Sequence, residues 1–285
     1  MIEVIEDFNE DAINESSEGK KLTDFAFCGK KEDFLGKIDY LARIAEKEAW
    51  SFNEKNNSIL LSYFNNTFTQ CYKENKIMYA EDEKSCCFNT GLLTSHGHDI
   101  IALFNRNANP NLMLEWYFKG FCEKSDRDFM DAFPEVPEVA EYTQNFIEYY
   151  FNPKKNIEIN SNHILDENWE NISKIIPLDK SIVKVLLFGV LEEAKKKVKR
   201  NPRLVVPQLY RNEIVYLLPI NIPIGSEKFI TFALAVQETE SGQYRANTIF
   251  TLDVAYKKAR MLMKPDSSWL SEQTVLKYLE DIHRN

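Results

Sequence analysis

Residues 243–263 read QYRANTIFTLDVAYKKARMLM, a strand-like run rich in hydrogen-bonding side chains that passes directly into an amphipathic helix. If Asp253 opens that helix, the spacing i, i+3, i+4 and i+7 puts four side chains on one helical face: Asp253, Tyr256, Lys257 and Arg260. Just upstream lie three more polar residues, Arg245, Asn247 and Thr248. The stretch therefore joins the two kinds of element that make an α+β fold and gathers polar groups at their junction.

This group combines an aromatic ring, a carboxylate and several cations, which together suit a polar, anionic ligand. The alternative is structural, because acidic and basic side chains at i, i+4 spacing commonly form ion pairs on a solvated helix face. The sequence leaves both interpretations open.

Outward from this stretch, apolar periodicity predicts helices at 31–50, 59–68 and 179–200, and a polar loop at 152–162. The segment 125–150 is expected to return to helix after the breaks at Pro134 and Pro137. Short runs rich in β-branched and aromatic residues predict strands at 77–80, 85–88, 99–104, 112–118, 204–206, 214–220 and 229–237. No repeat period and no clear interior linker is visible. The pattern predicts an α+β fold, a single domain with a central mixed sheet flanked by helices.

The composition excludes some classes of protein. The 285 residues carry a net charge of -9, which argues against broad adhesion to nucleic acid or to an anionic membrane but allows a local basic patch. No apolar run approaches the roughly 20 residues that span a bilayer. No signal segment is evident, and five cysteines are too few for a disulfide scaffold, so we expect a cytoplasmic protein with reduced thiols and no membrane partner. Residues 1–20 are acidic and predict a disordered leader.

Three further segments offer ligand-binding groups. The turn-like Asn89, Thr90 and Gly91 provide an amide, a hydroxyl and accessible backbone N–H groups for a phosphate or ribose, although a plain turn explains them equally well. Asn162 and His163 supply a second amide and a candidate general base, and Gln208 ends a buried strand. Glycine-rich nucleotide motifs and zinc-ligand spacings are absent, so we expect neither a cofactor nor a metal.

Several motifs together resemble a known family: AxxExW (45–50), FNTGL (88–92), NHIL (162–165), VPQ (206–208), LLPI (217–220) and YRANTIxTLDxAYxxAR (244–260). They are similar to the OST-HTH-associated domain, a bacterial domain of unknown function that occurs beside OST-HTH (LOTUS) modules. The resemblance covers residues 21–270, with a C-terminal helix at 271–285. It implies a link to RNA, with an OST-HTH-containing or other RNA-processing partner, but no established reaction.

The leading hypothesis is a module that binds RNA or a nucleotide in one polar cleft lined by the residues named above, with Tyr244 or Tyr256 available for stacking. One alternative is a hydrolase of RNA ends or nucleotides with His163 or Asp253 as general acid or base. Another is a protein-interaction scaffold, in which the polar strip is buried structure.

Overall fold

The chain forms two compact units, residues 1–144 and 145–285, in a computed structural model that describes residues 20–52, 57–108, 113–143, 145–211 and 213–283. Each unit contains helices and one five-stranded mixed sheet. The α+β class is therefore confirmed, whereas the single central sheet is wrong: there are two sheets, one in each unit. The acidic leader, apart from Lys20, lies outside the described residues.

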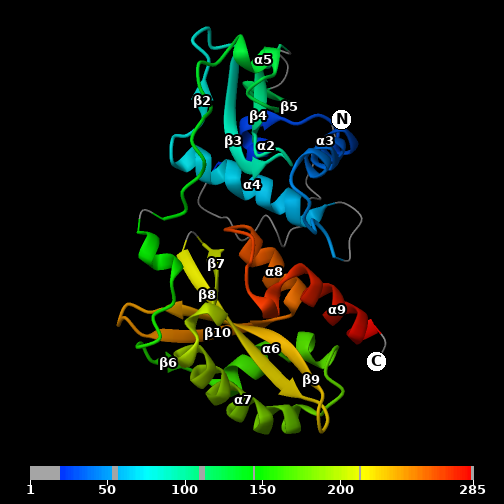
Figure 1. Ribbon diagram of the computed structural model, residues 1–285, viewed down its shortest axis with the longest axis vertical. Helices are drawn as coiled ribbons and strands as arrows, with labels where there is room; N and C mark the ends of the chain where they lie inside the picture. The colour runs from blue at the N-terminus through cyan, green and yellow to red at the C-terminus, as the bar shows by residue number, and fades with distance from the viewer. Residues whose placement is uncertain (1–19, 53–56, 109–112, 144, 212, 284–285) are drawn as a thin grey trace. The chain divides into compact units, whose positions relative to one another are not determined.

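The first unit has a helical half followed by an antiparallel meander (Figure 1). Its elements are α2 (Leu22–Phe25), β1 (Ala26–Phe27), α3 (Lys31–Ile44), α4 (Ser58–Lys73), β2 (Met78–Tyr79), β3 (Ser85–Leu93), β4 (Asp99–Arg106), β5 (Trp116–Cys122) and α5 (Arg127–Met130). The strand order is β1-β5-β4-β3-β2, in which only β1 runs parallel to its neighbour. The sheet thus begins with a strand that precedes both long helices.

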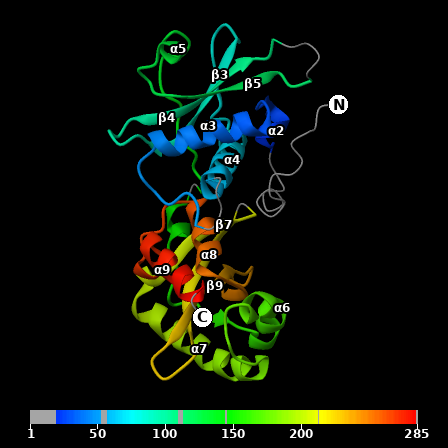
Figure 2. The same ribbon diagram turned by 90° about the vertical axis from the view of Figure 1, so that its right-hand side faces the viewer.

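Both faces of this first sheet are covered, by different elements. On one face α3 and α4 cross the strands (Figure 2), and Phe64 of α4 packs its ring within 5.5–5.6 Å of the Phe88 and Phe118 ring centroids. On the other face a smaller apolar cluster joins Leu103 to Phe129, near the end of α5. Because α5 is short, we expect it to cover only part of that second face.

The second unit has a longer helical half and a longer meander. Its elements are η1 (Phe146–Tyr149), β6 (Ile157–Glu158), α6 (Ser161–Ser173), α7 (Lys180–Arg200), η2 (Pro202–Leu204), β7 (Val206–Tyr210), β8 (Glu213–Pro223), β9 (Phe229–Glu238), β10 (Tyr244–Phe250), α8 (Leu252–Arg260), η3 (Ser268–Leu270) and α9 (Glu272–His283). The strand order is β6-β10-β9-β8-β7, with β6 parallel to β10. Helix α7 packs on β8 and α6 on β10, while α8 packs on β7 and β9.

The two units share one topology. In both, a two-residue strand is followed by two helices, four antiparallel strands and a short helix, and the first strand pairs in parallel with the last. The register of the last strand pair agrees as well. The first residue of β5, Trp116, lies opposite the last residue of β4, Arg106, and the first residue of β10, Tyr244, lies opposite the last residue of β9, Glu238. The chain is therefore a tandem repeat of one structural unit.

The agreement extends to an irregularity in the last strand of each meander. In β5, Phe118 and Gly120 face consecutive residues of β4, so Lys119 has no counterpart. In β10, Ala246 and Thr248 face consecutive residues of β9, so Asn247 has none. In each unit the bulge lies two residues after the last residue that pairs with the first strand, which is Tyr117 in β5 and Arg245 in β10. A β-bulge changes the direction in which a side chain points.

Two predicted segments are wrong. In the described part of 125–150, the helix expected after Pro134 and Pro137 is reduced to the single turn η1, and α5 lies before the two prolines. The predicted loop at 152–162 contains β6 and the start of α6, where the Asn160 side chain accepts a hydrogen bond from His163 N at 3.2 Å. The Asn-rich composition reflects this helix cap as much as a loop.

None of the helices in the described ranges combines the length and the apolar character that a bilayer-spanning segment requires.

Candidate functional site

The Asn89–Gly91 segment lies inside β3, and its polar groups serve the fold of the first unit. The Thr90 side chain is fully buried and donates to Ile100 O at 2.7 Å. Asn89, also buried, accepts a hydrogen bond from Gly91 N at 2.9 Å. Gly91 has φ +71°, and a Cβ there would lie 2.7 Å from the Tyr63 hydroxyl. These contacts explain the residue types at all three positions without a ligand.

The predicted polar face of α8 is turned largely into the second unit. Tyr256 and Arg260 are buried, and the Tyr256 hydroxyl donates to Glu272 Oε1 of α9 at 3.3 Å. Asp253 is half-buried near Tyr278 of α9; burial chiefly, and the Asp253 charge in addition, raise the pKa of that tyrosine. Lys257 is half-buried as well. This helical face is therefore partly buried, and Tyr256 and Asp253 lie beside α9.

Tyr244 and Gln208 are also buried. The Tyr244 ring stacks on Phe151 with centroids 4.6 Å apart, and its hydroxyl accepts from Asn152 N at 2.9 Å. It is therefore not presented to a base for stacking. Gln208 in β7 is 2% exposed, and its Oε1 has no hydrogen-bond partner within the described part of the chain.

Three of the predicted residues come together in one open pocket of about 570 Å³ at the β6 edge of the second sheet. His163 comes from the first turn of α6, and Arg245 and Asn247 come from β10. We call this the Arg245 pocket; its lining residues are Glu158, Ile159, Asn160, His163, Glu167, Arg245, Ala246 and Asn247. Asn162 also lies in the first turn of α6, and Asp253 does not line this pocket.

The charged groups of the Arg245 pocket are paired loosely. Arg245 Nη2 lies 3.8 Å from Glu158 Oε2, its neighbour across the parallel strand pair, and both side chains are more than half exposed. His163 Nε2 lies 3.2 Å from Glu167 Oε1, one helical turn later, again with both side chains exposed; this contact is an ion pair only when the imidazole is protonated. Exposed ion pairs contribute about 0–1 kcal/mol, so a ligand can displace them at small cost.

The position of α6 beside β10 is fixed by one buried amide. Asn168 is 6% exposed; its Oδ1 accepts from Thr248 Oγ1 at 2.7 Å, and its Nδ2 donates to Ile164 O at 2.7 Å. Thr248 therefore acts in the fold, next to the bulge. Asn247 is held from the other side, since its Nδ2 donates to Gln237 Oε1 at 3.1 Å.

Two carboxylates and a second amide of this pocket were not predicted from the sequence: Glu158, Glu167 and Asn160. Glu158 belongs to a two-residue strand within the predicted loop, and a strand that short gives no periodic signal. Asn160 and Glu167 had usable signals: an Asn three residues before His163 suits a helix cap, and Glu167 lies four residues after it.

The cysteines give no sign of a reactive site. All five are buried and free of disulfides. Burial raises the pKa of Cys28, Cys71 and Cys122 to about 12, and raises those of Cys86 and Cys87 further. The nucleophilic form of cysteine is the thiolate, so these thiols are poor nucleophiles at neutral pH. Within the ranges that the structure describes, no group of three or more metal-ligating side chains occurs.

The fold and the site together define a class: a tandem α+β repeat protein with an open polar pocket at the edge strand of its second sheet. The chain belongs to the DUF3825 family, a domain of unknown function, whose model matches residues 41–269 and so includes parts of both units. No curated protein and no solved structure matches the chain.

Proposed function

We propose that the protein binds single-stranded RNA or a nucleotide and that the Arg245 pocket holds one nucleotide of that ligand. The supporting observation is the convergence of His163, Arg245 and Asn247, which are far apart in the sequence, on one open pocket. The pocket is polar and accessible, as a site for a hydrophilic ligand must be.

The mixture of charges favours a nucleotide over a bare anion. Arg245 is the one permanent cation among the lining residues and can bind a phosphate through its planar guanidinium. Glu158 and Glu167 would repel further phosphates, but carboxylates accept hydrogen bonds from ribose hydroxyls and base amino groups. The amides of Asn160 and Asn247 can both donate and accept at a base edge.

This mixture of charges predicts that the binding affinity depends only weakly on salt concentration. One phosphate contact gives a slope of about -0.7 in a plot of log affinity against log salt for single strands, far from the steep slopes of proteins that bind many phosphates. Recognition of the 2′-hydroxyl by a carboxylate also predicts a preference for RNA over DNA of the same sequence.

The test compares binding of a fluorescently labelled single-stranded RNA, its DNA counterpart and mononucleotides to the wild type and to Arg245→Gln. The matched control is Arg203→Gln, an exposed arginine of the same unit outside the pocket. We expect Arg245→Gln to weaken RNA binding by about tenfold, the size of one charge-assisted hydrogen bond, and Arg203→Gln to leave it unchanged. Equal affinities of the wild type and a folded Arg245→Gln variant would exclude this pocket.

One contact favours a second candidate, hydrolysis of RNA ends or nucleotides. Glu167 Oε1 lies 3.2 Å from His163 Nε2, and a carboxylate can orient an imidazole that acts as a general base. In that case incubation with the bound nucleotide yields product, and His163→Ala abolishes turnover while binding persists. If every ligand is recovered intact, hydrolysis is excluded for these ligands and only the binding function remains.

The link to OST-HTH modules and the cytoplasmic location belong to the same proposal. The first is supported by the motif resemblance, and the second by five buried cysteines without disulfides, as expected in a reducing compartment. Co-purification with tagged OST-HTH proteins from the native host would test the association directly.

A further inference from the structure

The first unit has its own open pocket, on the face of its sheet that α5 covers only in part. The pocket has a volume of about 320 Å³ and contains the bulge residue of β5, Lys119. We call it the Lys119 pocket; its lining residues are Lys84, Ser85, Leu103, Asn105, Arg106, Lys119 and Asp128. None of these residues was among the candidates from the sequence.

The Lys119 pocket shares one feature with the Arg245 pocket: Lys119 and Asn247 are the extra residues of corresponding bulges, and each lines a pocket in its own unit. The rest of the lining differs. The Lys119 pocket is lined from β3, β4 and α5, whereas the Arg245 pocket is lined from β6, α6 and β10. The two pockets therefore lie on different parts of the repeated unit.

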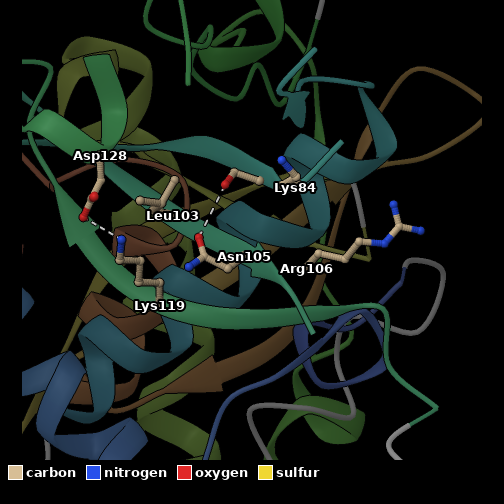
Figure 3. Close-up of a pocket in the computed structure, with 7 residues that line it drawn as sticks. Lys84, Leu103, Asn105, Arg106, Lys119 and Asp128 are labelled. Atoms are coloured by element: carbon tan, nitrogen blue, oxygen red, sulfur yellow. Dashed lines mark hydrogen bonds and ion pairs between the residues drawn. The ribbon is translucent and has the colours of Figure 1, made fainter. Parts of the chain in front are cut away.

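Asn105 and Leu103 lie at the centre of the Lys119 pocket, between Lys119 and Lys84 (Figure 3). Leu103 is 3% exposed and forms the apolar base beside Asn105. The Ser85 hydroxyl donates to Asn105 Oδ1 at 3.4 Å, which leaves the Asn105 NH2 as a hydrogen-bond donor. Within the described ranges, that NH2 group has no partner in the protein.

Two cations lie on either side of this amide. Figure 3 shows Lys119 with Asp128 on one side of Asn105 and Lys84 on the other, while the Arg106 guanidinium points away. Arg106 is engaged elsewhere, with Nη2 3.1 Å from Glu115 Oε1. Lys84 is paired as well, with its Nζ 3.3 Å from Asp82 Oδ2, and both of these side chains are more than half exposed. Among the lining residues themselves three are cationic and one, Asp128, is anionic, a positive balance that the lining of the Arg245 pocket does not have.

We propose that the Lys119 pocket is a second ligand site, one that binds a phosphate group. The unprotonated oxygens of a phosphate group accept hydrogen bonds, and the pocket offers them the Lys84 and Lys119 ammonium groups and the Asn105 NH2. A carboxylate-rich site, such as the Arg245 pocket, suits hydroxyl and amino donors instead. This inference goes beyond the proposed function, because the two sites lie in different units and either can fail without the other.

Asp128 limits the affinity of this site. Its Oδ2 lies 2.5 Å from Lys119 Nζ, and the hydrogen bond from Lys119, together with its charge, lowers the pKa of Asp128, so the carboxylate is ionised at neutral pH. A bound phosphate must compete with this carboxylate for the Lys119 ammonium. Removing the Asp128 charge should therefore strengthen phosphate binding, whereas removing the Lys119 charge should weaken it.

The experiment follows backbone amide NMR signals of the full chain during titration with inorganic phosphate, with sodium chloride at equal ionic strength as reference. We expect saturable shifts for Ser85, Asn105 and Lys119, about fivefold weaker binding in Lys119→Gln and several-fold tighter binding in Asp128→Asn. Lys47→Gln removes an exposed lysine of the same unit outside the pocket and should change nothing. Repetition with a 5′-phosphorylated and a 5′-hydroxyl RNA oligomer distinguishes a terminal phosphate from the RNA backbone.

Unchanged phosphate binding in Lys119→Gln, or weaker binding in Asp128→Asn, would overturn the proposal, as would shifts that sodium chloride reproduces. Both variants alter exposed side chains, so folding is preserved, and the thermal unfolding temperature verifies this. Loss of phosphate binding in Lys119→Gln with RNA binding at the Arg245 pocket intact would show that the two sites act independently.

Discussion

Replacing Asn168 by leucine tests whether one buried amide holds α6 against β10. Leucine has a similar volume, so the change leaves little cavity and chiefly removes hydrogen bonds. The Thr248 hydroxyl is half-buried and loses its 2.7 Å acceptor, and Ile249 N loses a longer contact of 3.4 Å. Ile164 O loses the hydrogen bond that the Asn168 side chain donates.

A buried donor without a partner costs about 1–3 kcal/mol, and we take about 2 kcal/mol for this site. For a cooperative unit of this size, about 3 °C of unfolding temperature corresponds to 1 kcal/mol, so the second unit should melt about 6 °C earlier. The assay is differential scanning calorimetry on the full chain. Asn171→Leu, the same substitution at an exposed position of α6, is the control and should shift the transition by less than about 2 °C.

Asn168→Leu should also lower the affinity of any ligand for the Arg245 pocket, because His163 and Glu167 belong to α6. Equal unfolding temperatures for Asn168→Leu and Asn171→Leu would refute the reasoning, since the buried hydrogen bonds would then contribute nothing to stability.

Two further predictions concern the first unit and the pH dependence of stability. Gly91→Ala should destabilise the protein by about 2 kcal/mol or more in urea unfolding, because alanine is strained at φ +71° and its Cβ would lie 2.7 Å from the Tyr63 hydroxyl. Gly36→Ala in α3, where a Cβ would have nothing within 4 Å, should stabilise the protein instead. Equal effects of the two substitutions would contradict this prediction. Burial raises the thiol pKa values above the unfolded value of 9.0, to about 12 for Cys28, so the thiols of the unfolded chain release their protons first. The contribution of the thiols to the free energy of unfolding should therefore be constant below about pH 8 and fall as the pH rises through 9 toward 12. The fall is up to about 1.4 kcal/mol per pH unit for each fully shifted thiol. Urea midpoints measured between pH 7 and 10.5 test this, and a midpoint that stays constant to pH 10.5 would contradict it.

The sequence predicted local structure well where the side chains show a period. The apolar face of residues 179–200 corresponds to α7, and the apolar run at 229–237 to β9, because burial on one face leaves a direct mark on the sequence. The single sheet was wrong because strand pairing is set by contacts between distant segments. Two-residue strands, β1 and β6, form one edge of each sheet, and they are too short to show a periodic pattern in the sequence.

The candidate site was predicted in part for a similar reason. Arg245 and Asn247 were predicted because they belong to a polar, strand-like run that leads into a helix, and His163 because its imidazole is a candidate general base. Glu158 was missed because only the parallel pairing of β6 with β10 brings it beside Arg245. The burial of Tyr256 and Arg260 was not predictable, because helical spacing shows which residues share a face but not whether that face is exposed to solvent.

The repeated topology has a consequence for separating the two units. Each half of the chain supplies every strand of its own sheet, so a cut between residues 144 and 145 would leave both sheets with all of their strands.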